Sequence, residues 1–207
     1  MHLSESATLF LKFRANSELL LSRRNATITY KGRNFVFEYN TKTLRFVPLA
    51  LCEIFAYGSY EELNVKGKEV VDIGASIGDT AIYFLANGAR RAYCFETSPH
   101  RFSVSKRNLR MNGYLQKVKL FNKEFDFRTL HLRGSSNALK VDCEGCEYAL
   151  FDTGGSTLKY IASKFNQIVM EYHNGDTEIR KALESHGYRV KVSRTSRSRG
   201  ILYAKRA

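Results

Sequence analysis

The stretch VVDIGASIGDTAIYF, residues 70–84, constrains the fold of this 207-residue chain more than any other. Its first four residues, Val70 to Ile73, form a short apolar run that is typical of a buried strand. A turn with glycine at positions 74 and 78 follows, and residues 79–87 are expected to form a helix. Glycine lets the backbone approach a ligand closely, and a helix N-terminus offers free amide donors. The stretch therefore predicts a ligand site at the end of a buried strand.

The same order of strand, loop and helix continues through the rest of the chain. We expect further strands at 92–96, 118–122, 138–142 and 167–172, helices at 99–112 and 177–186, and a terminal β pair at 188–192 and 201–204. Strands that alternate with helices indicate an α/β fold with a doubly wound, mostly parallel sheet. Such sheets bind ligands in the crevice at the carboxyl ends of their strands.

The first 66 residues follow a different pattern. Two β-leaning runs, 26–30 and 34–39, flank Lys31-Gly32-Arg33 and predict a hairpin, and apolar spacing over 48–63 predicts a helix. We predict that residues 1–66 form an appendage or cap packed on a ligand-binding domain of residues 67–207, since no linker separates the two.

Composition indicates a protein of the cytoplasm with an excess of positive charge. Lys and Arg number 33 against 20 Asp and Glu, which gives a net charge of +13. Such a surplus attracts nucleic acid, acidic membrane or anionic metabolites, or it reflects a basic proteome. No apolar run approaches the roughly 20 residues of a membrane span, and residues 1–14 lack the features of a signal peptide. No motif indicates an oligomeric state.

The glycine turn differs from a dinucleotide site. Its spacing is G-x-x-x-G, because Ser76 stands where the second glycine of G-x-G-x-x-G would be. Asp72 would repel a pyrophosphate but suits a cationic amino group. Glu96 ends the second strand, eighteen residues after Gly78, where a carboxylate can accept both ribose hydroxyls. These features disfavour a nicotinamide oxidoreductase. The alternative to a ligand site is a tight turn between strand and helix whose acidic side chains are solvated.

These residues also carry a family resemblance. VVDIGASIGDTAIYF and FETSP resemble motifs I and II of the class I S-adenosylmethionine-dependent methyltransferases. More narrowly, DIGASIGDT, LKVDCEGCE, MEYH and ILYAKR resemble the FkbM family, over roughly residues 67–205. The resemblance implies a Rossmann-like fold and S-adenosylmethionine as the cofactor. The cofactor-binding residues that it implies are Asp72, Gly74, Ala75, Ser76, Gly78, Asp79, Glu96, Thr97 and Asp142, with Asn122 as the candidate on the adenine side.

The stretch KVDCEGCEY, residues 140–148, raises the question of a metal or redox site. Cys143 and Cys146 supply two of the four ligands of a structural zinc site, or a thioredoxin-like motif at a helix start. The acids beside them would raise a thiol pKa and so disfavour a reactive thiolate. We therefore expect the cysteines to pack, without a metal and without a disulfide framework.

The acidic residues of this stretch are the better candidates for chemistry. Asp142 ends the fourth strand, where the family places a residue beside the transferred methyl group. Glu144 and Glu147 are three residues apart at a helix start and should face the same side, although Glu147 also fits a first-turn acid stabilised by the helix dipole. His173 follows the fifth strand, where it can act as a base or bind the acceptor, unless it is a satisfied or surface histidine. The catalytic candidates are Glu144, His173 and Asp142.

We expect from these motifs a methyltransferase that O-methylates a hydroxyl of a sugar or another small or glycosidic acceptor. The alternatives are an RNA (tRNA or rRNA) methyltransferase of the same fold and a non-catalytic nucleic-acid-binding module. Amino-group methylases usually carry an Asn/Asp-Pro-Pro-aromatic motif where this chain has Asp142-Cys143-Glu144-Gly145, and neither proline adjoins a cysteine, as a C5-pyrimidine methylase requires. Three acids at a pocket mouth also suit a phosphodiester backbone poorly.

Overall fold

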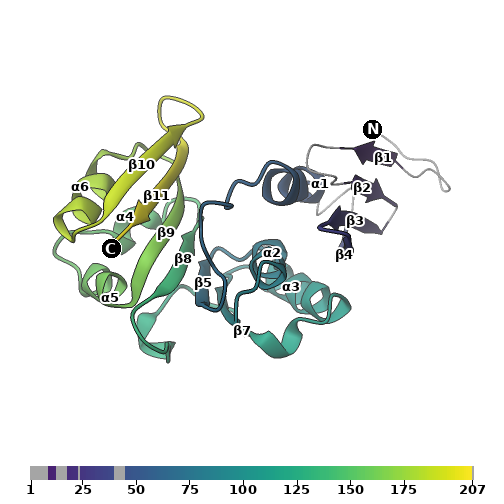
Figure 1. Cartoon of the computed structure of the whole chain (residues 1–207), viewed down its shortest axis with the longest axis horizontal. Coiled ribbons are helices and arrows are strands. Elements are labelled where there is room, and N and C mark those ends of the chain that lie inside the picture. The colour runs from purple at the N-terminus through teal and green to yellow at the C-terminus, as the bar shows by residue number, and fades with distance from the viewer. Residues whose placement is uncertain (1–8, 13–17, 23, 40–44, 207) are drawn as a thin grey trace.

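The computed structural model describes residues 9–12, 18–22, 24–39 and 45–206, and it contains two sheets (Figure 1). The smaller is antiparallel, in the order β1-β2-β3-β4. Its strands are β1 (Leu9–Lys12), β2 (Glu18–Leu21), β3 (Asn25–Tyr30) and β4 (Arg33–Glu38). The turn between β3 and β4 has Lys31 and Gly32 at positive φ, and the predicted hairpin is confirmed.

The larger sheet has seven strands in the order β10-β11-β9-β8-β5-β6-β7. These are β5 (Glu69–Ile73), β6 (Arg91–Phe95), β7 (Val118–Phe121), β8 (Asn137–Val141), β9 (Phe165–Tyr172), β10 (Arg189–Arg194) and β11 (Gly200–Lys205). The five strands from β9 to β7 pair in parallel, and β11 lies antiparallel between β9 and β10. The predicted doubly wound, mostly parallel sheet is confirmed.

Helices cover both faces of this sheet (Figure 1). Residues of α2 (Asp79–Ala86) and α3 (Pro99–Met111) share one hydrophobic cluster with the N-terminal sheet. Residues of α4 (Glu147–Leu150), α5 (Ser156–Lys164) and α6 (Thr177–Ser185) belong to the cluster on the other face. Two single turns, η3 (Leu115–Lys117) and η4 (Phe127–Thr129), complete the connections.

The helix predicted over residues 48–63 is shorter in the structure. It consists of α1 (Val47–Leu51) and one π-helical turn, η2 (Cys52–Ala56), and its C-cap is Tyr57. Gly58 follows with φ +70°, a backbone conformation that ends a helix readily. The residues beyond it form turns, although Tyr60 and Leu63 are buried. The apolar pattern there therefore indicates buried positions and not a helix.

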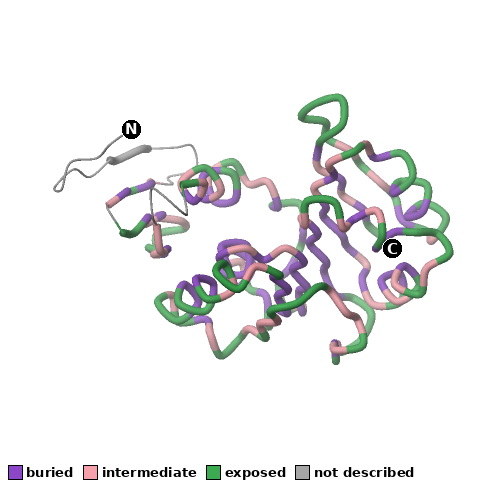
Figure 2. The backbone as a smooth tube through the Cα atoms, turned by 180° about the vertical axis from the view of Figure 1, so that it is seen from behind, coloured by how far each residue is buried: buried purple, intermediate pink, exposed green. Residues whose placement is uncertain are grey.

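The N-terminal segment and the large sheet share a core. The cluster that contains Phe35, Phe37 and Phe55 also contains Val70 and Phe84, and buried residues continue from one part into the other (Figure 2). The division at residue 66 remains a prediction. Among the described residues, no helix is long and apolar enough to cross a bilayer.

Candidate active site

A cleft of about 1260 Å³ opens where the parallel strands end. Its walls come from the loops after β5, β6, β7 and β8, the end of β9, helices α4 and α5, the N-terminal segment at 46–60, and the β10–β11 turn. The N-terminal segment therefore contributes directly to the candidate site. Among the predicted residues, those that line the cleft are Gly74, Ser76, Asp79, Glu96, Thr97, Asp142 and Glu144.

Gly74 allows the turn after β5 to touch the end of β8. Its φ is +80°, and a Cβ atom there would lie 1.7 Å from the carbonyl oxygen of Asp142. The amides of Gly74 and Ala75 both donate to the carbonyl of Phe95, each at 3.0 Å. The turn is thus fastened to both neighbouring strands, and no side chain fits at position 74.

Glu96 joins the first and second loops. Its Oε2 accepts from the amide of Ser76 at 2.9 Å, and its Oε1 accepts from the amide of Ser98 at 2.7 Å. Each carboxylate oxygen has a second lone pair, which leaves acceptor capacity for a ligand in the cleft. Ser76 itself has φ +46°, a backbone conformation that residues other than glycine rarely adopt. The hydrogen bond from its amide to Glu96 holds it there.

Three predicted cofactor residues lie behind the cleft lining rather than in it. Ala75 is fully buried, and Gly78 caps α2 with φ +82° and packs against Ser105. The side-chain amide of Asn122 donates to the carbonyls of Glu96 and Thr97, at 2.8 and 3.1 Å. These residues shape the loops, whereas the ring of Phe125, edge-on to Phe95 at 5.1 Å, lies in the cleft wall.

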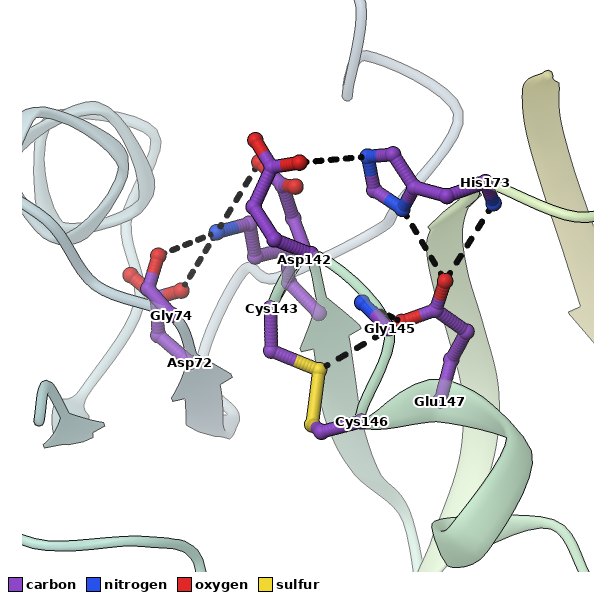
Figure 3. Close-up of a disulfide and its surroundings, with 10 residues drawn as sticks. Asp72, Gly74, Asp142, Cys143, Gly145, Cys146, Glu147 and His173 are labelled. Atoms are coloured by element: carbon purple, nitrogen blue, oxygen red, sulfur yellow. Dashed lines mark hydrogen bonds and ion pairs between the residues drawn. A yellow bond between two sulfur atoms is a disulfide. The ribbon is translucent and has the colours of Figure 1, made fainter.

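Asp72 is also behind the lining, where it is paired with Lys140 on the neighbouring strand. The two residues are in register on β5 and β8, and Lys140 Nζ lies 3.0 Å from Asp72 Oδ1 (Figure 3). Thr80 donates to the other carboxylate oxygen at 2.5 Å, and Lys140 also donates to the Gly74 carbonyl at 2.9 Å. Although burial lowers the pKa of Lys140, the carboxylates of Asp72 and Asp142 outweigh it and raise that pKa above its ordinary value. Lys140 is not among the residues that the sequence motifs indicated.

Asp79 is a buried acid that faces the cleft from the first turn of α2. Burial raises its pKa to about 6, against the ammonium of Lys140, which lowers it. Its Oδ1 accepts from the amide of Thr80 at 3.1 Å. The carboxyl group therefore ionises near pH 6. A cationic group of a ligand placed beside it would favour the ionised form.

Cys143 and Cys146 form a disulfide, which corrects the expectation that they only pack. Glu144 and Gly145, with φ +57° and +121°, fold the stretch into a turn that brings the two Cα atoms to 5.5 Å. That turn could not be read from residue types alone. The other two cysteines, Cys52 and Cys94, are free and buried.

His173 is held by Glu147, a residue that is fully buried at the start of α4 (Figure 3). Glu147 Oε1 lies 2.9 Å from His173 Nδ1 and accepts from the His173 amide at 3.2 Å. Its other oxygen accepts from the amide of Gly145 at 2.8 Å. The helix-dipole explanation of Glu147 is therefore incomplete, because both of its oxygens hold the two loops that carry Glu144 and His173.

Further carboxylates surround this histidine. Glu144, whose side chain is 74% exposed, approaches His173 Nε2 to 3.4 Å, and Glu171 approaches it to 3.9 Å. Burial and the charge of Asp142 raise the pKa of Glu171, and the same two causes raise the pKa of Glu53 across the cleft. The structure thus brings together the three predicted catalytic residues and adds Glu147 and Glu171, which were outside the predicted catalytic set, and Glu53, which no motif indicated.

Comparison with solved structures identifies the fold as that of class I S-adenosylmethionine-dependent methyltransferases. An S-adenosylmethionine-dependent O-methyltransferase from Thermotoga maritima matches with a TM-score of 0.59 and 12% identity, over 99% of this chain and 94% of that one. Precorrin-6y C5,15-methyltransferase from Geobacter metallireducens matches with a TM-score of 0.54 and 18% identity, over 84% and 94% of the two chains. Magnesium protoporphyrin IX methyltransferase from Synechocystis, solved with bound S-adenosylhomocysteine, gives 0.51 and 17%, over 79% and 82%.

Sequence comparison gives one partial relative and no family. Protein 65 of a Sulfolobus islandicus filamentous virus is 28% identical over 92 residues, which are 43% of this chain. The match spans about half, 53%, of that relative's length. No family model matches the chain.

Proposed function

We propose that the protein is an S-adenosylmethionine-dependent methyltransferase of the FkbM type that methylates a hydroxyl of a sugar or another small glycosidic acceptor. The observation that carries the proposal is one cleft that is lined both by the Gly74–Glu96 loop pair and by Asp142, Glu144 and Glu171, the carboxylates around His173. The first half suits the cofactor, and the second suits an acceptor hydroxyl.

The cofactor half fits S-adenosylmethionine by shape and charge. Gly74 lets the loop lie against the end of β8 at the cleft wall, and Glu96 retains lone pairs for ribose hydroxyls. Phe125 offers an apolar face for adenine, and Asp79 offers a carboxylate for the ammonium group. When bound there, the cofactor supplies an electrophilic methyl group on a sulfonium. Asp72 and Lys140 then act as positioning residues, because they support the loop from below.

The acceptor half fits a neutral polyol. Carboxylates such as Asp142 and Glu144 accept hydrogen bonds from hydroxyls and orient them, and orientation is the main requirement of an in-line displacement. Because Glu147 holds Nδ1 of His173, Nε2 is the nitrogen that faces Glu144 and Glu171, two acids of the cleft wall. That nitrogen can take up a hydroxyl proton, or it can bind another ligand.

A second candidate function is methylation of RNA, which Thr195 and Arg199 favour. Both belong to the basic β10–β11 turn, and both line the cleft. A phosphate-binding rim would be consistent with the net charge of +13. The acids at the cleft floor oppose it, since they would repel a backbone phosphate brought to Asp142.

The test is calorimetric titration of the purified protein with S-adenosylmethionine and, separately, with NAD. We expect binding of S-adenosylmethionine only. Glu96→Gln should weaken it roughly 10-fold or more, as expected for loss of hydrogen bonds to a charged group. Phe125→Leu, which leaves the contacts of Glu96 untouched, should weaken it as well.

Glu178→Gln is the matched control, because Glu178 is an exposed acid on α6 outside the cleft. Thermal melts of each variant report whether the fold is kept. Absence of S-adenosylmethionine binding by the folded wild-type protein would refute the proposal. Titration with a short RNA in the same buffer, at two salt concentrations, decides between the two acceptor classes.

A further inference from the structure

Asp142, Glu171 and His173 bring three metal-ligand atoms together at the carboxyl ends of β8 and β9. One carboxylate oxygen from each acid and one imidazole nitrogen all lie within 4.8 Å of one another. They come from neighbouring parallel strands: Asp142 directly follows β8, Glu171 is in β9, and His173 directly follows it. An ion that bonds such atoms at about 2.1 Å in tetrahedral geometry places neighbouring ligands about 3.4 Å apart. Small side-chain rotations therefore suffice to close the site.

The orientation of His173 points to a ligand. Its side chain is only 8% exposed, yet Nε2 has no hydrogen-bond partner among the described residues. Glu147 sits against the opposite nitrogen, Nδ1, at 2.9 Å. If Nδ1 carries the proton, Nε2 carries the lone pair, and the carboxylates nearest to it are those of Glu144, at 3.4 Å, and Glu171, at 3.9 Å. A histidine that donates one ring N–H to a carboxylate and binds a metal through the other nitrogen is the common arrangement at metal sites.

The charge around this space also calls for a cation. Four carboxylates line this part of the cleft: Glu53, Asp142, Glu144 and Glu171. Lys140 is shared, because its ammonium is closer to Asp72, at 3.0 Å, than to Asp142, at 3.8 Å. Like charges brought together in a partly buried site repel, and an ion of charge +2 relieves that repulsion more fully than protonation of one acid.

We propose that Asp142, Glu171 and His173 bind one divalent transition-metal ion, which holds the acceptor hydroxyl. Mixed imidazole and carboxylate ligands suit ions such as Mn²⁺, Fe²⁺ or Zn²⁺. Three protein ligands are fewer than such an ion takes up, which would leave coordination positions for other groups, as in catalytic sites. No metal was expected from the sequence, because the only ligand set considered there was one built on the Cys143–Cys146 pair.

The role in transfer rests on the proposed function. A hydroxyl bound to the ion becomes a stronger acid, and its proton passes to the exposed Glu144 carboxylate and then to water. The oxygen then forms a bond to the methyl carbon while the carbon–sulfur bond breaks, and that electron pair stays on sulfur. His173 is in this case a ligand through Nε2 and not the base.

The first experiment measures metal binding by the chelator-stripped protein. Co²⁺ is titrated and followed by visible absorption, which reports nitrogen and oxygen ligation, and Mn²⁺ is followed by loss of its free-ion EPR signal. We expect one ion per chain. No binding of either ion at millimolar concentration would overturn the proposal.

Variants then locate the ion. Glu171→Gln should abolish binding, and Glu147→Gln should weaken it about 10- to 100-fold with a changed Co²⁺ spectrum, because Glu147 orients the ligand without touching the ion. Glu178→Gln on α6 should bind as the wild type does. If Glu147→Gln fails to fold, Glu171→Gln, at a half-exposed side chain, still decides the question. Equal binding by Glu171→Gln and the wild type would overturn the assignment.

Failure of this inference is distinguishable from failure of the proposed function. S-adenosylmethionine binding is measured on the same stripped protein, and Glu96→Gln should reduce it without changing Co²⁺ binding. Cofactor binding without metal binding would overturn only the metal site and leave His173 as the candidate base. Metal binding without cofactor binding would overturn methyl transfer, and with it the assigned role of the ion.

Discussion

Single residues at this site carry out two tasks at once. Glu96 faces the cleft, and it also holds the amides of Ser76 and Ser98. Asp79 begins α2, and it is at the same time a buried acid whose pKa burial raises to about 6. A group of this kind couples stability to pH, and the sign of the coupling follows from the direction of the shift.

Asp79→Asn tests that coupling. The pKa of Asp79 is near 3.8 in the unfolded chain, so the folded protein binds this proton more tightly than the unfolded chain does. The carboxyl group therefore contributes its full stabilisation below about pH 4. The contribution is lost as pH rises through about 6, by up to about 1.4 kcal/mol for each pH unit. Asparagine can still accept from the Thr80 amide. We expect the variant to gain stability over the wild type at pH 8 and not at pH 4, in urea unfolding at both values. A difference that is the same at both pH values would contradict this.

At the scale of elements, the turn between β5 and α2 depends on its contact with the end of β8. Gly74 and Gly113 both have positive φ, +80° and +76°, but only Gly74 has another chain segment where a Cβ would lie. Position 113 has no atom within 4 Å of that point. The two glycines therefore separate the cost of backbone conformation from the cost of close approach.

Gly113→Ala should lower the free energy of unfolding by about 1–2 kcal/mol, the cost of a left-handed conformation for a residue with a side chain. Gly74→Ala adds displacement of the Asp142 carbonyl, and we expect roughly 3 kcal/mol or more, together with loss of cofactor binding. Urea unfolding of both variants measures the difference. Equal losses would mean that the loop can move away from β8 at little cost.

The elements of the large sheet were predictable because each buried strand is a short apolar run bounded by polar or glycine residues. Helix α5 was not predicted, although its buried residues Leu158, Ile161 and Ala162 have helical spacing that identifies it. The candidate site was predictable only in part. Glycine spacing and strand ends indicated Gly74, Glu96 and His173, but pairs that meet through space could not be read from spacing.

Two such pairs decide the site's electrostatics. Lys140 meets Asp72 because β5 and β8 pair in one register, and Glu147 meets His173 across 26 positions of sequence. Neither register nor the left-handed conformation at Glu144 follows from residue type, since both result from the packing of the whole sheet. The disulfide escaped prediction for the same reason.

At the scale of the whole molecule, the N-terminal segment belongs to the same core as the sheet. Phe35, Phe37 and Phe55 pack in one cluster with Tyr83 and Phe84 of α2, and the rings of Phe55 and Tyr83 are 5.4 Å apart. An appendage that buries this much aromatic surface against a domain is unlike an independent module.

We therefore expect one cooperative unfolding transition for the whole chain, with the same midpoint by far-ultraviolet circular dichroism and by tyrosine fluorescence. Phe55→Ala should lower the stability of the whole protein by about 3–5 kcal/mol and keep the two midpoints coincident. Leu49→Ala is the matched control, because Leu49 is 63% exposed, and it should change little. Two separated transitions would show that residues 1–66 unfold as a unit of their own.

The position of β11 in the sheet has a consequence for biosynthesis. Strand β10 leaves the ribosome before β11, yet β11 is its only partner in the part of the chain that the structure describes. Until β11 has emerged, β10 has no place in the sheet, and the neighbouring edge of β9 stays open to other chains. The intervening turn, residues 195–199, carries Arg197 and Arg199, and positive charges of this kind disfavour pairing between nascent copies by mutual repulsion.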